Sequence, residues 1–201
     1  MPVVPGREYR AMSLLLPTAA GKRIDTDYYV EGYATTFDQP YVLFEEDGVQ
    51  YKEVIDRNAL VGADMSDVIM QYDHRGSVLA RQSNGTLVIV PDRAGLFVAA
   101  DLSKSVAARN LHEEISNQLI TKMSWAFTVA EESYDRITHT RRILRIKKVY
   151  DVSAVSLPAN PSTDISARSW LDGVIEAERQ ERLAAEAAVR RAKKIKILME
   201  V

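Results

Sequence analysis

The sequence predicts a mainly β fold of the α+β class, with helices around a β core and a long helix at the C-terminal end. Three observations lead to this prediction. Short segments rich in β-branched and aromatic residues recur at regular spacing, which is typical of a sandwich or barrel. One segment near the middle of the chain has the apolar spacing of an amphipathic helix. After residue 162 the composition shifts to Ala, Glu and Arg, which favour helix.

The composition is that of an ordinary globular protein, with 46% hydrophobic and 27% charged residues. A length of 201 residues allows one sizeable domain and an appendage. The net charge of −2 argues against a nucleic-acid binder that uses its whole surface, and the absence of cysteine excludes disulfides, thiolate nucleophiles and cysteine-based metal sites. No segment has the roughly 20 apolar residues that span a bilayer, and the N-terminus lacks the pattern of a signal peptide. We therefore expect no membrane partner and no export through a cleaved signal.

The strands of the core are predicted from segments that are rich in β-branched and aromatic residues and end at turn residues. They are expected at 28–37, 41–44, 49–55, 68–72, 77–80, 86–90, 96–100, 125–129, 138–149 and 151–157. Gly32 marks a bulge or a bend in the first of them. Residues 1–25 alternate short apolar pieces with Pro and Gly and predict an extended N-terminal arm with at most one strand. The core domain is expected to cover residues 26–166.

Turn residues predict how these strands are connected. Glu45–Gly48 is a turn signal between two strand-like segments and predicts a hairpin. The pair Asn84-Gly85 is the strongest short hairpin signal that a sequence can offer. Asp56 is expected to cap a short helix, because its carboxylate accepts the free N–H groups at a helix start.

Two longer helices are predicted. The first begins after Ser103 or Ser105, and its apolar residues recur every three or four positions, so we expect them to pack on the core. They are Ala108, Leu111, Ile115 and Leu119. The second starts near Ala167 and is rich in strong helix formers. Residues 167–201 are therefore assigned to a C-terminal helix, whose thin apolar stripe suggests that part of it projects or meets a partner.

The strand predicted at 138–149 carries many basic side chains. Apolar and charged residues alternate in it, so one face is expected to be exposed. We expect these basic residues to form a solvated face rather than a nucleic-acid contact.

Three segments supply the residue types that an activated hydroxyl nucleophile requires. Ser124 lies where the first helix gives way to a strand, His74 follows a buried-looking strand, and Asp151 begins the last core strand. Taken alone, a serine between Met123 and Trp125 is more often a small polar residue in a packed strand, and a histidine at a strand end is commonly just a hydrogen-bonded polar residue. Together the three residues predict a Ser-His-Asp triad.

Other arrangements of the same residue types were weighed. Asp73 offers a second carboxylate next to His74, although adjacent residues on a strand point to opposite faces. A metal held by His74, His112 and His139 is disfavoured, because their spacings of 38 and 27 residues fit no short ligand motif. No cofactor is expected. A hydrolase with paired carboxylates ranks last, since no single motif holds a spaced acidic pair.

The chain resembles the prohead (capsid maturation) serine proteases of tailed bacteriophages, a family similar in fold to the herpesvirus assemblins. The likeness runs from about Tyr28 to Ser166 and rests on five motifs in the order of the family. They are Glu31-Gly-Tyr-Ala34, Asp73-His74 with Val78-Leu-Ala-Arg81, Ala94-Gly-Leu-Phe-Val98, Lys122-Met-Ser-Trp-Ala-Phe127 and Asp151-Val-Ser-Ala-Val-Ser-Leu-Pro-Ala-Asn-Pro161.

The resemblance implies an assemblin-like closed β-barrel of about seven strands with surrounding helices. It further implies an endopeptidase that digests the scaffold protein, or the scaffolding segment of the major capsid protein, inside the immature prohead in the host cytoplasm. His74 would be the general base and Ser124 the nucleophile. The resemblance is compatible with a homo-oligomer, and it implies neither a membrane nor a specific nucleic acid as partner.

This chain departs from the pattern of the family at the third triad position. The family usually has Glu before Val-Ser in the last strand, whereas this chain has Asp151, a side chain shorter by one methylene. Assemblins use a second histidine instead, for which His112 and His139 are the only candidates here. The identity of the third member therefore stays open between Asp151 and a second histidine.

A second departure follows the serine. The family often has a small residue and then glycine after it, and Trp125 and Ala126 in their place predict a bulkier loop. Backbone N–H groups near Ser124 are expected to stabilise the oxyanion, with Arg81 as a candidate to assist them. The alternative to a protease is a non-catalytic module for capsid assembly or scaffold binding on the same barrel, in which Ser124 is structural.

Overall fold

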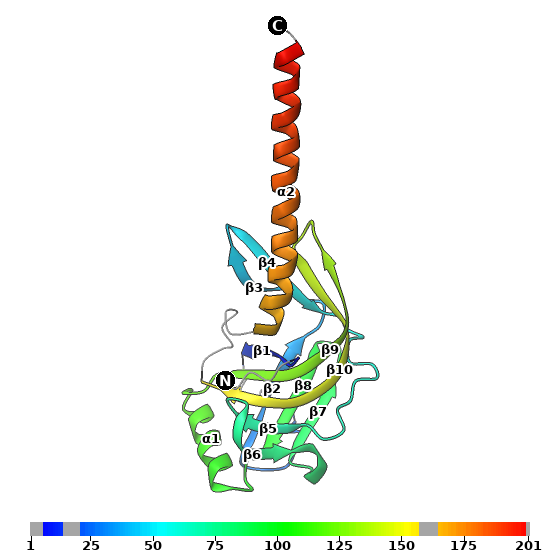
Figure 1. The fold of residues 1–201 in the computed structure, drawn as a ribbon. Coiled ribbons are helices and arrows are strands. Elements are labelled where there is room, and N and C mark those ends of the chain that lie inside the picture. The colour runs from blue at the N-terminus through cyan, green and yellow to red at the C-terminus, as the bar shows by residue number, and fades with distance from the viewer. Residues whose placement is uncertain (1–5, 14–20, 157–164, 200–201) are drawn as a thin grey trace. The chain divides into compact units, whose positions relative to one another are not determined.

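A computed structural model describes residues 6–13, 21–156 and 165–199 of the chain (Figure 1). By its internal contacts the chain forms two compact units, residues 1–164 and 165–201. The first unit contains all of the described strands, in two sheets. The larger sheet has seven strands: β1 (Glu8–Ser13), β3 (Tyr41–Glu46), β4 (Val49–Ile55), β5 (Ile69–Tyr72), β6 (Arg75–Arg81), β9 (Lys122–Asp135) and β10 (Thr140–Val155). The smaller sheet consists of β2 (Tyr29–Thr36), β8 (Gly95–Asp101) and β7 (Leu87–Pro91).

The two longest strands, β9 and β10, organise the larger sheet. They pair antiparallel with each other, and β1 pairs along the other edge of β9 (Figure 1). The second edge of β10 is shared by two parallel neighbours, with β4 beside residues 140–143 and β5 beside residues 151–154. The strands predicted separately at 138–149 and 151–157 thus form one strand, because β-bulges let β10 bend without interrupting its pairing with β9.

The prediction of a mainly β fold with helices is confirmed. Among the described strands, the pairings close neither sheet on itself, although β2 lies beside β1 and β9 where the two sheets meet. The closed barrel of about seven strands therefore stays a prediction. Within residues 6–13 and 21–25, the described part of the predicted arm, there is one strand, β1, and it belongs to the larger sheet.

One hydrophobic core joins the two sheets and the first helix, α1 (Val106–Ser116). The side chain of Ser105 caps α1 by accepting the N–H of Ala108 at 3.1 Å. The predicted apolar stripe is buried except for Leu119, which is 71% exposed because the helix ends three residues before it. The core includes Leu111 and Ile115 from α1, Trp125 and Val152 from the larger sheet, and Leu87 and Val98 from the smaller one.

The hairpin predicted at Glu45–Gly48 is confirmed. Glu46 pairs with Val49, and the two residues between them, Asp47 and Gly48, have φ of 52° and 78°. Positive φ at both central positions gives the loop the twist that an antiparallel strand pair requires.

Three local predictions are wrong. Asn84-Gly85 does not make a hairpin: β6 pairs with β5 and β7 with β8, so the pair ends a 3₁₀ turn (Gln82–Asn84) that links the two sheets. Asp56 caps no helix, since residues 57–62 form turns and its carboxylate accepts the N–H of Asn58 at 2.9 Å. The irregularity in β2 falls at Ala34, between Tyr33 and Thr35, and not at Gly32.

The predicted C-terminal helix is confirmed as α2 (Ile165–Met199). Among its described apolar side chains, Leu183 and Val189 are exposed, whereas Val174 and Ile175 are partly buried. Within the described residues, no helix combines the length and the apolar character needed to cross a membrane.

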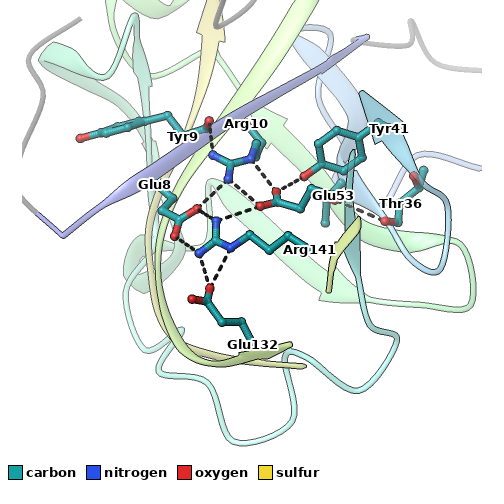
Figure 2. A network of polar contacts seen from close by, with 9 residues as sticks. Glu8, Tyr9, Arg10, Thr36, Tyr41, Glu53, Glu132 and Arg141 are labelled. Atoms are coloured by element: carbon teal, nitrogen blue, oxygen red, sulfur yellow. Dashed lines mark hydrogen bonds and ion pairs between the residues drawn. The ribbon is translucent and has the colours of Figure 1, made fainter. Parts of the chain in front are cut away.

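Arg141 corrects the expectation that the basic residues of β10 form a solvated face. Its guanidinium is buried in a network of charged side chains from β1, β4, β9 and β10, in which Glu132 on β9 is a further partner of Arg141 (Figure 2). At the centre lies the carboxylate of Glu53 on β4, which is 0% exposed and accepts from Arg10 at 2.6 and 2.7 Å and from Arg141 at 3.0 Å. Glu8 on β1 accepts from both guanidinium groups at 2.6 to 2.7 Å. The hydroxyl of Tyr41 also donates to Glu53.

Burial of these charges is tolerated because each of them is paired. An unpaired carboxylate or guanidinium away from water costs several kcal/mol, whereas a paired and hydrogen-bonded one recovers most of that cost. The remaining basic residues of β10 lie nearer to solvent, as predicted, and three of them have acidic partners. The pairs are Arg142 with Asp38 and Asp56, Arg145 with Glu131, and Lys148 with Asp64.

Removal of the central charge is expected to be costly. We predict that Glu53→Gln lowers the free energy of unfolding by about 3 to 5 kcal/mol, because it removes one of the two carboxylates that the buried guanidinium groups share. The matched control is Glu131→Gln, which breaks a pair whose side chains are 52% and 62% exposed and should cost less than about 1 kcal/mol. Denaturant unfolding of the two variants measures both effects. Equal losses would contradict the role given to the network.

The network also predicts a pH dependence through Glu8. Burial alone would raise the pKa of this carboxyl, but hydrogen bonding to Arg141 and the charges of Arg10 and Arg141 outweigh it and lower the pKa below its usual 4.5. A group with a lowered pKa in the folded state stabilises the fold above its unfolded pKa, and this stabilisation is lost as the pH falls through the folded pKa. The free energy of unfolding should therefore fall as the pH drops below about 4.5, and Glu8→Gln should reduce that slope. An unchanged slope in the variant would assign the acid sensitivity to other groups.

Candidate active site

Ser124 is the third residue of β9 and lies on the opposite side of that strand from the core. Side chains alternate along a strand, so Met123, Trp125 and Phe127 enter the core while Ser124 and Ala126 share the other face. Trp125 stacks on Phe127 with a ring distance of 4.1 Å. The expectation of a bulkier loop after the serine is therefore wrong, because residues 124–127 lie within the strand and the indole faces away from the hydroxyl.

Pairing with β10 brings Asp151 to the same face. Ser124 pairs with Ser153, and Asp151 lies two residues before Ser153. Val149 pairs with Phe127 and Asp151 with Ala126, so Tyr150 is the extra residue of a β-bulge. A bulge bends its strand and redirects the side chains next to it, and here it directly precedes the carboxylate.

His74 reaches this face from the tight turn between β5 and β6. Tyr72 pairs with Arg75, which leaves a two-residue loop in which Asp73 and His74 have φ of 48° and 57°. Such loops usually contain Asn-Gly, because other residues resist positive φ. Backbone conformations of this kind cost of order 1 to 3 kcal/mol per residue and cluster at functional sites.

The turn is anchored by Asp73. Its N–H donates to the carbonyl of Ala154 at 3.0 Å, and its carboxylate accepts the N–H of Ser156 at 3.2 Å. The side chain of Asp73 thus holds the turn against the end of β10 and is not placed to orient the imidazole. This leaves the neighbouring His74 free to point toward β9.

The structure brings His74, Ser124 and Asp151 together. The distance from His74 Nε2 to Ser124 Oγ is 2.7 Å, and that from His74 Nδ1 to Asp151 Oδ1 is 2.5 Å. A carboxylate can only accept, so Nδ1 carries a proton and Nε2 of the neutral ring accepts the hydroxyl of Ser124. This is the geometry of a nucleophile, a general base and an orienting acid.

The site is enclosed by residues that sequence reasoning did not select. Tyr9 on β1 packs its ring edge-on against His74 at 4.7 Å, and Ser153 donates its hydroxyl to Asp151 at 2.8 Å. The exposed fractions of Ser124, His74 and Asp151 are 0%, 7% and 4%. The N-terminal segment has no motif, and only the pairing of β1 with β9 reveals its part in the site.

A cleft of about 520 Å³ lies between β6 and α1. Tyr72, Arg75 and Gly76, which flank the Asp73-His74 turn, form one wall, and residues of α1 such as Asn110 and Glu114 form another. None of the three triad residues lines it. The cleft therefore lies beside the Asp73-His74 turn but does not contain the triad.

The other candidate residues have different partners. Arg81, the oxyanion candidate, holds Asp67 in an exposed ion pair, and these contacts give no support to that role. His112 on α1 packs edge-on against Tyr28, and burial followed by the charge of Lys22 lowers its pKa. His139 lies in the turn between β9 and β10, where it contacts the hydroxyl of Tyr134. Of the residues considered for the third position, Asp151 is the one in contact with His74.

The three histidines thus lie in separate surroundings. Over the described part of the chain, no group of His, Asp and Glu side chains is arranged to hold a metal ion.

One family model matches the chain over residues 18–174, and the family it represents is described as caudovirus prohead serine protease. The matched segment includes His74, Ser124 and Asp151 but not β1. No curated protein and no solved structure matched the chain significantly.

The geometry predicts that Ser124 is chemically activated. A small organophosphorus fluoride, diisopropyl fluorophosphate, should add one phosphoryl group to the protein, and peptide mapping should locate it on Ser124. His74→Ala should slow this reaction by about 10²- to 10⁴-fold, because the general base is lost. The control is Ser116→Ala at the exposed end of α1, which should react like the wild type. Modification of other serines at the same rate would show that Ser124 is not activated.

Proposed function

The chain belongs to the caudovirus prohead serine proteases, and on this basis we propose that it is the endopeptidase that cleaves scaffold protein, or the scaffolding segment of the major capsid protein, during prohead maturation. The observation that carries the proposal is the position of His74, whose two ring nitrogens contact Ser124 and Asp151 at 2.7 and 2.5 Å. The reaction is proposed to take place inside the immature prohead, in the host cytoplasm.

In the proposed mechanism, Ser124 Oγ attacks the carbonyl carbon of the scissile peptide while His74 Nε2 takes the hydroxyl proton. His74 then gives this proton to the leaving amine as the tetrahedral intermediate collapses to an acyl-enzyme. A water molecule, activated by the same nitrogen, hydrolyses the acyl group. Asp151 keeps the imidazole in the required tautomer and stabilises the imidazolium that forms in each step.

The shielding of His74 and Asp151 from water supports this mechanism. Charge develops on the imidazole and on the carbonyl oxygen, and electrostatic stabilisation of such charge is stronger where water is excluded. The aromatic edge of Tyr9 and the pairing of β1 with β9 provide this exclusion on one side. We place the substrate residues next to the scissile bond in the cleft between β6 and α1, because its wall continues into the turn that carries His74.

A second candidate function is a non-catalytic module for capsid assembly or scaffold binding. The complete burial of Ser124 favours this alternative. A serine whose only role is to hydrogen-bond a histidine does not have to be accessible to a substrate. The two functions differ in one respect that can be tested. Proteolysis requires the hydroxyl of Ser124, whereas binding does not.

The proposed protease should produce defined fragments. When the wild type is co-expressed with its cognate scaffold and major capsid proteins, intact-mass analysis is expected to show cleavage products. Ser124→Ala and His74→Ala should produce none, with at least a 10³-fold loss of rate for each, as expected when one member of a triad is removed. Ser133→Ala, an exposed serine at the far end of β9, is the matched control and should cleave like the wild type. Fragments that persist in both variants would exclude this triad, and their absence with the wild type would favour the binding module.

A further inference from the structure

Asp151 has a second hydrogen-bond donor besides His74. Its Oδ1 atom accepts from His74 Nδ1 at 2.5 Å and from Ser153 Oγ at 2.8 Å. Ser153 is completely buried, as is Ser124, with which it pairs across β9 and β10. We propose that Ser153 is a positioning residue that holds the Asp151 carboxylate in the orientation that directs the imidazole of His74 at Ser124.

The strand geometry explains why residue 153 is suited to this task. Residues two apart on a strand lie on the same face, so Ser153 and Asp151 point to the same side of β10. The register places Ser153 directly opposite Ser124 on that face. The hydroxyl of Ser153 therefore lies beside both β9, which carries Ser124, and the carboxylate of Asp151. It can thus fix the position of the carboxylate relative to Ser124.

The carboxylate needs such a restraint for two reasons. It follows a β-bulge at Tyr150, where the backbone is less regular than in an ordinary strand. Rotation about its single bonds would carry Oδ1 away from Nδ1 unless another contact opposes it. The hydroxyl of Ser153 supplies that contact, and a hydrogen bond to a charged acceptor is about twice as strong as one between neutral groups.

Core packing does not explain a hydroxyl at this position. The neighbours Val152, Ala154 and Val155 are apolar and buried, and a buried hydroxyl is costly unless it is hydrogen-bonded. Alanine would fill nearly the same volume without that cost. Ser153 Oγ donates its hydrogen bond to Asp151, so we assign the presence of this hydroxyl to the carboxylate.

The inference rests on the proposed function for its catalytic meaning, and the variants Ser153→Ala and Ser153→Thr test it. With scaffold or capsid protein as substrate, Ser153→Ala is expected to lower kcat by about 10- to 100-fold, with KM and the thermal midpoint close to those of the wild type. Ser153→Thr keeps a hydroxyl and should recover most of the loss. Ser133→Ala again serves as the matched control from the same strand pair.

A double-variant cycle separates positioning from a general effect of the mutation. In the Asp151→Asn background the group that Ser153 restrains is already changed, so Ser153→Ala should lower kcat by less than about twofold further. Additive losses would show that Ser153 acts independently of Asp151 and would overturn the inference. Wild-type kcat in Ser153→Ala would overturn it as well.

A spectroscopic readout distinguishes failure of this inference from failure of the proposed function. The proton on His74 Nδ1 should give a low-field proton resonance, identified by its loss in His74→Ala. In Ser153→Ala this resonance should broaden or shift, because the carboxylate is less restrained. If the wild type cleaves no substrate but the resonance responds in this way, the positioning role stands and the peptidase function fails. If it cleaves and the resonance is unchanged, the positioning role fails and the function stands.

Discussion

The antiparallel pairing of β9 with β10 is the interaction on which the site depends. It places Ser124 opposite Ser153 and brings Asp151 to the same face, although these residues lie far apart in the chain. It also orders the rest of the larger sheet. β1 pairs with the edge of β9 that faces away from β10, and β4 and β5 share the edge of β10 that faces away from β9. The histidine turn follows β5 directly, so even the position of the general base derives from the register of β10.

A second constraint is the buried network around Glu53 (Figure 2). Buried charges contribute little net stability as pairs, but they are intolerant of misplacement, because any register other than the native one would leave a charge unpaired. The network joins β1, β4 and β10 through Arg10, Glu53 and Arg141. Since β1 also carries Tyr9, which packs against His74, the same contacts that hold the first strand in the sheet keep an aromatic wall beside the imidazole.

Local sequence predicted the features that depend on a few neighbouring residues. Turn chemistry predicted the Asp47-Gly48 hairpin, and capping predicted the helix that follows Ser105. Composition predicted the long C-terminal helix. Signals of the same kind were wrong where distant strands decided the outcome. Asn84-Gly85 ends a link between two sheets because β6 and β7 have other partners, and Arg141 is buried because carboxylates from three other strands surround it.

The sequence by itself determined the chemical types of the site and their family: a serine, a histidine and a carboxylate in motifs that occur in the order of the prohead proteases. It could not choose between Asp151 and a second histidine, nor recognise Tyr9 and Ser153, because none of these choices has a local signature. Only the tertiary structure decided them. The reason is that hydrogen bonds of 2.5 to 2.8 Å among side chains from the β5–β6 turn, β9 and β10 are set by strand register and bulges, which arise from long-range pairing.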